Sequence, residues 1–155
     1  MIANSTPIIC FAKIGQLRLL KMLFSSVTIT EAVKEEVLVE GKPGYSSIND
    51  ALSEGWIRVA NPKQMVELGL GKGENSSLSI AKESDDKLLI DDASAIRAAK
   101  ALGIDFIRTT SVLIMAVKRK IITKKQAVSL IGQLVKAGYY ISPRYLTEIL
   151  AKLTT

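Results

Sequence analysis

The sequence predicts an α/β fold with a mainly parallel sheet of four or five strands. Short apolar runs alternate along the chain with longer stretches in which apolar residues recur at helical spacing. One run, Leu88 to Ile90, is apolar at every position, as a strand buried on both faces requires, and Asp91 and Asp92 follow it at once. Because ligands of open parallel α/β sheets bind at the carboxyl ends of the strands, this acidic pair indicates a functional site.

The length and the charge of the chain limit the number of domains and the kinds of partner. With 155 residues, of which 48% are hydrophobic, the chain is expected to form a single domain over residues 1–155. Lys and Arg number 21 against 15 Asp and Glu, a net charge of +6, which is compatible with a polyanionic partner such as nucleic acid. These charges are spread over several helices without a dense basic tail, so they support that partner only in combination with a site.

The residue types that the sequence lacks exclude several kinds of catalytic and metal-binding site. The sequence has no histidine and one cysteine, Cys10, which excludes His-ligated zinc, Ser-His and Cys-His triads and a disulfide within one chain. Any metal must therefore be bound by oxygen. No apolar run approaches the ~20 residues of a membrane span, and the start of the sequence lacks the features of a signal peptide, so we expect a cytoplasmic protein without a membrane partner.

The first elements alternate in the expected way. Residues 1–3 form a strand, and Asn4 to Pro7 start a helix, since hydroxyl caps followed by proline are typical of a first turn. The apolar spacing continues past Gly15, which divides it into two helices. Residues 27–29 form the next strand, and Thr30 caps the helix that follows.

The middle of the chain is less regular. A helix is expected before Gly55, and residues 56–60 alternate like an edge strand in which Trp56 packs rather than stacking on a base. Residues 62–70 are interpreted as a linker or a loosely formed helix. The glycine-rich stretch 70–74 then opens a helix, but it lacks the Gly-Lys-Ser/Thr ending of a phosphate-binding loop.

After the aspartate pair, a helix from Ala93 to Leu102 is expected to end at Gly103. Residues 104–108 then form the last strand, with Thr109 and Thr110 at its carboxyl end. Three helices complete the chain: residues 112–117, a helix opened by the capping box Thr123 to Gln126, and a helix opened by Ser142-Pro143.

Oxygen-bearing side chains gather at one expected edge of this sheet. Some follow predicted strands and two lie on helices close behind: Asn4, Glu36, Glu74, Asp91, Asp92, Thr109 and Thr110. Such a cluster is what a hard divalent cation requires, and Mg²⁺ or Mn²⁺ is the natural candidate. Purely structural roles remain open, because one aspartate can cap the next helix and Glu74 can complement a helix dipole.

The order of these short motifs resembles the PIN domain, the fold of VapC-type toxin ribonucleases, and most closely a PIN-like subgroup. The matching segments span almost the whole chain: Ala3 to Pro7, Glu36-Val37, Leu70 to Glu74, Leu78 to Ala81, Leu89 to Asp92, Gly103 to Ile107, and Ile141 to Pro143. The resemblance implies a three-layer α/β/α fold. It also implies an endoribonuclease in which metal-bound water attacks RNA.

Carried over, the resemblance assigns the site. Glu36, Glu74 and either Asp91 or Asp92 are expected to bind Mg²⁺ or Mn²⁺, directly or through water, and the choice between the two aspartates stays open. Thr110, or its neighbour Thr109, is expected to bind a phosphate or to orient water. The resemblance further implies RNA as substrate, a role as the toxin of a toxin–antitoxin pair with an antitoxin protein as partner, and a homodimer.

One departure from the family pattern bears on activity. Asn4 stands where the first catalytic residue is normally aspartate, and Glu74 stands where many members have aspartate. Asparagine still offers a carbonyl oxygen but removes one negative charge, so metal affinity should fall. The alternative is therefore a catalytically weak or inactive PIN-like module that binds nucleic acid or protein. A receiver-like phospho-acceptor domain disagrees with the order, since its acidic pair follows the first strand.

Overall fold

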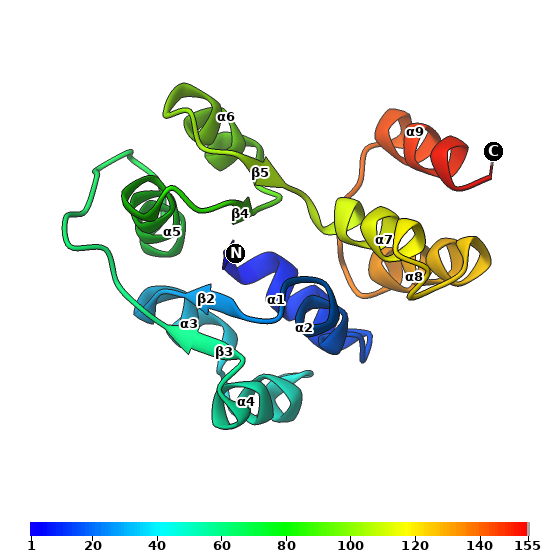
Figure 1. Cartoon of the computed structure of the whole chain (residues 1–155), viewed down its shortest axis with the longest axis horizontal. Helices are drawn as coiled ribbons and strands as arrows, with labels where there is room; N and C mark the ends of the chain where they lie inside the picture. Colours follow the sequence, from blue (N-terminus) through cyan, green and yellow to red (C-terminus); the bar gives the residue numbers. More distant parts are fainter. Residues whose placement is uncertain (155) are drawn as a thin grey trace.

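A computed structural model of the chain describes residues 1–154 and places five strands of this stretch in one parallel sheet (Figure 1). The order across the sheet is β3-β2-β1-β4-β5, and every pairing is parallel. The prediction of a mainly parallel sheet of four or five strands is thus confirmed. The strands are β1 (Ile2–Ala3), β2 (Val27–Ile29), β3 (Ile57–Val59), β4 (Leu88–Leu89) and β5 (Phe106–Ile107).

Helices connect the strands and cover the sheet. The part of the chain that the structure describes contains α1 (Ser5–Lys13), α2 (Arg18–Phe24), α3 (Glu31–Val37), α4 (Tyr45–Glu54), α5 (Lys72–Ser84), α6 (Ala93–Ala101), α7 (Thr109–Lys118), α8 (Lys124–Lys136) and α9 (Pro143–Thr154). The capping box predicted at Thr123 is present, with both of its reciprocal hydrogen bonds to Gln126.

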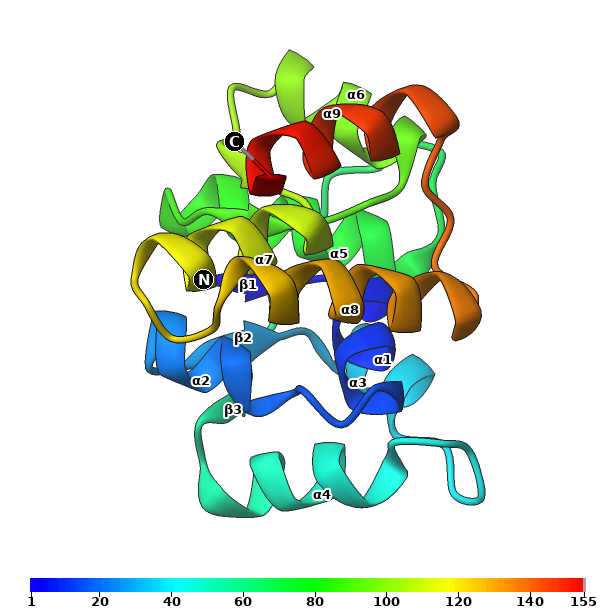
Figure 2. The ribbon, with the colours of Figure 1, turned by 90° about the vertical axis from the view of Figure 1, so that its right-hand side faces the viewer.

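The two faces of the sheet are buried against different helices, because successive side chains of a strand point to opposite faces. Ile2, Leu88 and Ile90 pack with residues of α5 and α6, whereas Ala3 and Leu89 belong to the larger cluster built with α1–α4 and α7–α9. Figures 1 and 2 show these helices on opposite sides of the strands. The expected three-layer α/β/α architecture is confirmed.

Some local details differ from expectation. Helix α7, which follows the last strand, begins at Thr109 rather than at residue 112. Thr109 and Thr110 therefore lie in its first turn, directly after the extended Arg108. Residues 62–70 contain no regular helix, which agrees with the linker, one of the two expected alternatives. Trp56 is buried and its indole N–H donates to Glu54, which agrees with a packing role. Among the helices of residues 1–154, none is both long and apolar enough to cross a membrane.

The strand order fixes where a ligand can bind. The chain runs from β1 outward through β2 to β3, and then returns to the other side of β1 to form β4 and β5. The direction of winding therefore reverses between β1 and β4, and the carboxyl ends of strands at such a reversal flank the usual ligand crevice of open α/β sheets.

Candidate active site

Asn4 follows β1 and Asp91 follows close after β4, so both residues lie at the reversal point of the sheet. The backbone N–H of Asn4 donates to the carbonyl of Leu89 at 3.0 Å, which ties the two strand ends together. This backbone contact between the ends of β1 and β4 brings the residues that follow the two strands to the same edge of the sheet.

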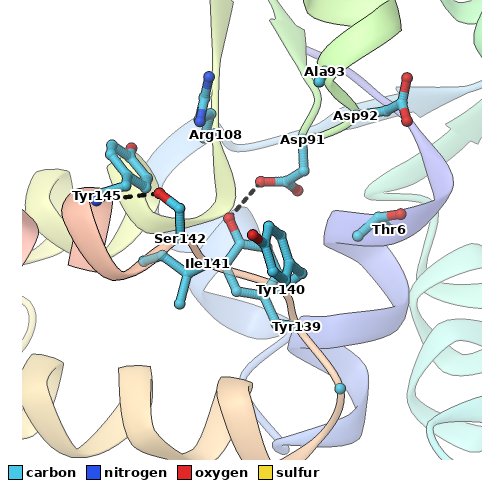
Figure 3. Close-up of a pocket in the computed structure, with 11 residues that line it drawn as sticks. Thr6, Asp91, Asp92, Ala93, Arg108, Tyr139, Tyr140, Ile141, Ser142 and Tyr145 are labelled. Carbon is cyan, nitrogen blue, oxygen red and sulfur yellow. Dashed lines mark hydrogen bonds between the residues drawn. The ribbon is translucent and has the colours of Figure 1, made fainter.

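Asp91 is held by three donors. Its Oδ1 accepts from the backbone N–H of Thr109 at 3.0 Å and from the Tyr139 hydroxyl at 2.7 Å, while its Oδ2 accepts from the Thr109 hydroxyl at 2.6 Å. Figure 3 shows the carboxylate directed at Tyr139. These bonds join the end of β4 to the start of α7 and to the segment before α9. Because the acceptor is charged, they are stronger than hydrogen bonds between neutral groups.

Burial and the negative charge of Asp91 raise the pKa of two groups, Tyr139 and Cys10. Burial, and then the charge of Asp91, raise the pKa of Tyr139 above its usual range, so its hydroxyl remains a donor. Cys10 on α1 responds in the same way: burial first and the charge of Asp91 second raise its pKa to about 11, against the smaller opposing effect of Lys13.

Asp92 has a different role from its neighbour. Its side chain is exposed, and Oδ2 accepts the backbone N–H of Ala95 at 2.9 Å as the N-cap of α6. Figure 3 shows Asp92 directed away from Asp91, on the side where Thr6 of α1 lies. The helix-capping role that was open for either aspartate therefore belongs to Asp92, which keeps its other carboxylate oxygen for further contacts.

Asn4 is buried, with 4% of its surface exposed, and occupies the N-cap of α1. Its side chain makes no capping hydrogen bond, and its Oδ1 has no donor among the described residues. A buried carbonyl oxygen without a partner costs about 1–3 kcal/mol. A cation or an ordered water at this position would remove that cost, and the carbonyl oxygen of Asn4 is chemically able to contact either.

Glu36 lies between the starts of α1 and α5. The hydroxyl of Ser5 donates to its Oε2 at 2.6 Å, and its carboxylate contacts Gly73 so closely that no Cβ would fit there without moving it. Glu74 follows on α5, where its carboxylate lies against Gly71, the N-cap residue. This position close to the amide groups of the first turn also suits the dipole role.

The two remaining predicted residues, Thr109 and Thr110, form hydrogen bonds with other side chains of the fold. Thr109 is occupied by Asp91, and the buried Thr110 shares a hydrogen bond of 2.9 Å with the Tyr145 hydroxyl. Within residues 1–154, no three Asp, Glu or Cys side chains converge closely enough to hold a metal ion. The Glu36 carboxylate therefore lies against Ser5, the residue after Asn4, and Gly73, whereas Asp91 is bonded to Thr109 and Tyr139, so the polar residues of this edge fall into separate groups.

Sequence reasoning missed Tyr139 as a partner of Asp91. The nearby Ile-Ser-Pro motif marked this part of the chain as family-specific, and Tyr139 precedes it by two residues. Its position after Gly138, which adopts a positive φ of 101°, was a further local signal of a bend. A contact over 48 residues of sequence depends on how α8 returns to the sheet, which no local pattern encodes.

A five-stranded parallel sheet with carboxylates at its reversal point defines an α/β protein whose ligand site lies at the carboxyl edge of the sheet. The family model described as a PIN domain (DUF3368) matches residues 1–155, and the chain therefore belongs to the PIN-domain family. Members of this family are generally nucleases that depend on divalent metal ions.

A solved structure agrees on the fold. The PilT N-terminus domain protein from the hyperthermophilic archaeon Sulfolobus solfataricus P2 is 22% identical in sequence, with a TM-score of 0.53 over 76% of this chain and 94% of that one. At this identity the likeness concerns the fold alone. Among proteins with curated descriptions, none matches the chain.

Proposed function

We propose that this PIN domain is an endoribonuclease of the VapC-like type that uses Mg²⁺ or Mn²⁺. The observation that carries the proposal is the buried Oδ1 of Asn4, which lies at the strand reversal and has no hydrogen-bond partner within residues 1–154. An oxygen in this position, beside the Ser5–Glu36 pair, suits a hard cation.

Asn4, Glu36, Glu74 and Asp92 would hold the ion partly through bridging waters, because no three carboxylates of residues 1–154 converge on one point. Asp92 is favoured over Asp91 because, among the described residues, one of its oxygens accepts a hydrogen bond, from a backbone N–H, whereas both oxygens of Asp91 accept hydrogen bonds from side chains or backbone. A bound divalent cation supplies an activated water and neutralises phosphate charge. Ser5 orients Glu36 through its hydroxyl, and Gly73 leaves the space that the Glu36 carboxylate occupies.

The test restores the missing charge. Asn4→Asp should bind Mn²⁺ about tenfold tighter or better, a difference of about 1.4 kcal/mol, and should raise Mn²⁺-dependent cleavage of a mixed RNA pool. The double variant Asp91→Asn with Asp92→Asn should lose both. Asp50→Asn, an exposed change on α4, serves as the matched control, with titration calorimetry as the readout for binding.

A binding module is the second candidate, favoured by the neutral Asn4 and by the lack of convergent carboxylates in residues 1–154. It predicts that wild type and Asn4→Asp are both silent in calorimetry and in cleavage while RNA or a protein partner still binds. That result would replace the nuclease proposal.

We extend the proposal to the biological role: a cytoplasmic toxin that acts on RNA, is neutralised by an antitoxin protein and works as a homodimer. The family resemblance supports this role as a whole, and the net charge of +6 supports RNA as the partner. Induced expression in a bacterial host should stop growth, whereas the double aspartate variant should not. Light scattering of the purified protein checks the dimer.

A further inference from the structure

A pocket of about 520 Å³ opens beside the acidic pair, and its volume is in the range of small-ligand sites. One wall comes from the strand ends and the other from the segment between α8 and α9 (Figure 3). The residues that matter for the argument are Asp91, Asp92, Arg108, Tyr139, Tyr140 and Tyr145.

Arg108 supplies a cation to this pocket. Its guanidinium lies 5.0 Å from the centre of the Tyr145 ring, and no ion pair found within residues 1–154 involves it. The Tyr145 hydroxyl is bonded to Thr110, so the ring under the guanidinium is itself held in place. A planar cation on an aromatic face, without a carboxylate partner, is suited to bind a phosphate.

Tyr140 supplies a free aromatic face. It is 82% exposed, which is unusual for a large ring, while its neighbour Tyr139 is buried and bonded to Asp91. The backbone that carries Tyr140 is therefore anchored. Exposed rings beside a basic group are the means by which proteins bind unpaired bases, because every base has a face that can stack.

We propose that this pocket is a nucleotide subsite for single-stranded RNA, in which an unpaired base stacks on Tyr140 and its phosphate pairs with Arg108. The inference rests on the proposed ribonuclease function and names where the substrate lies. Two carboxylates share the pocket: the charge of Asp91 is met by three donors, and Figure 3 shows Asp92 on the other side of Asp91 from Arg108. The phosphate therefore belongs on the Arg108 side.

Binding without cleavage tests the subsite. Fluorescence anisotropy with a labelled oligouridylate, in EDTA and at low salt, should show that Tyr140→Ala weakens affinity about 5- to 150-fold, the size of one base–aromatic stack. Tyr140→Phe should bind within about twofold of wild type, since the ring face remains. An abasic oligomer should bind wild type and Tyr140→Ala equally.

The salt dependence separates the two contacts. Arg108→Gln should weaken binding and lower the slope of log affinity against log salt by about 0.7, the share of one phosphate contact, whereas Arg108→Lys should keep that slope. Tyr140→Ala should leave the slope unchanged. Matched controls are Arg58→Gln on β3 at the opposite edge of the sheet, and Tyr45→Ala on α4.

The outcomes decide between the subsite and the wider proposal. Unchanged RNA affinity in both Tyr140→Ala and Arg108→Gln would overturn the subsite, even if Mn²⁺-dependent cleavage by wild type upholds the nuclease. Binding lost in these variants without any cleavage would keep the subsite and remove the nuclease. No RNA binding by wild type at low salt would overturn the subsite and favour a protein partner.

Discussion

The two parts of the carboxyl edge differ in how their polar atoms are satisfied. Around Asp91, both carboxylate oxygens accept hydrogen bonds, from Thr109 and Tyr139. Around Asn4, the buried Oδ1 has no partner in the described part of the chain, and Glu36 accepts a hydrogen bond from the Ser5 hydroxyl. Unpaired buried polar atoms are rare and costly. The polar atoms around Asp91 are therefore satisfied without a ligand, whereas the group around Asn4 is incomplete and gains stability only when a ligand binds.

The largest expected effect follows from removing the centre of the complete part. Asp91→Ala leaves the N–H and hydroxyl of Thr109 and the hydroxyl of Tyr139 without their acceptor, and should lower the free energy of unfolding by about 3–5 kcal/mol. Urea unfolding followed by circular dichroism measures it. A loss below 1 kcal/mol would show that these three bonds do not stabilise the fold.

The burial of Cys10, reinforced by the charge of Asp91, predicts a loss of stability in alkaline solution. The pKa of Cys10 rises from 9.0 to about 11 on folding, so the folded state favours the protonated thiol. Its contribution is present below pH 9 and is lost as the pH rises to 11, about 2–3 kcal/mol in total. Cys10→Ala should therefore have a shallower decline of stability between pH 9 and 11 than wild type. Parallel declines would contradict the assignment.

The sheet could be predicted from sequence because each strand is a short apolar run between helix signals. Leu88 to Ile90 with Asp91 and Asp92 gave both the buried strand and the edge that carries the polar groups. The starts of helices at Thr30 and Thr123 were equally local, since a cap needs only the next three residues. Register and strand order are long-range properties, but the alternation of strands and helices left few choices.

The site was less predictable than the fold. Neighbouring aspartates have identical chemistry, and only the coordinates separate Asp92 as the helix cap from Asp91 as the acceptor for Thr109 and Tyr139. The start of α7 at Thr109 was hidden because Thr109 and Thr110 are weak helix formers, held there by long-range contacts with Asp91 and Tyr145.

Asp92 should matter less for stability than Asp91, although the two are adjacent. Asp92→Ala removes one capping hydrogen bond at an exposed position and should cost about 1 kcal/mol. Asp92→Asn keeps a capping oxygen and should stay within about 0.5 kcal/mol of wild type, while Mn²⁺ binding falls if Asp92 is a ligand. Thermal unfolding and calorimetry of the two variants separate these roles; equal Mn²⁺ affinity in Asp92→Asn and wild type would place the ligand elsewhere.

The smallest effect on stability, with a specific effect on the metal, is expected at Gly73. Inside a helix, alanine is favoured over glycine by about 1 kcal/mol, but a Cβ at Gly73 would displace the Glu36 carboxylate. That carboxylate is the end of a flexible chain and can move, so Gly73→Ala should change the free energy of unfolding by less than about 0.5 kcal/mol.

Gly132 on α8 provides the matched control, since an added Cβ there meets nothing within 4 Å. Gly132→Ala should stabilise the protein by about 0.5–1 kcal/mol and leave Mn²⁺ binding unchanged. Gly73→Ala should instead bind Mn²⁺ at least about tenfold more weakly, because Glu36 is no longer held beside α5. If both variants stabilise the fold equally and bind Mn²⁺ like wild type, the Glu36 carboxylate is free to move without consequence, and the incomplete part of the edge is not a metal site.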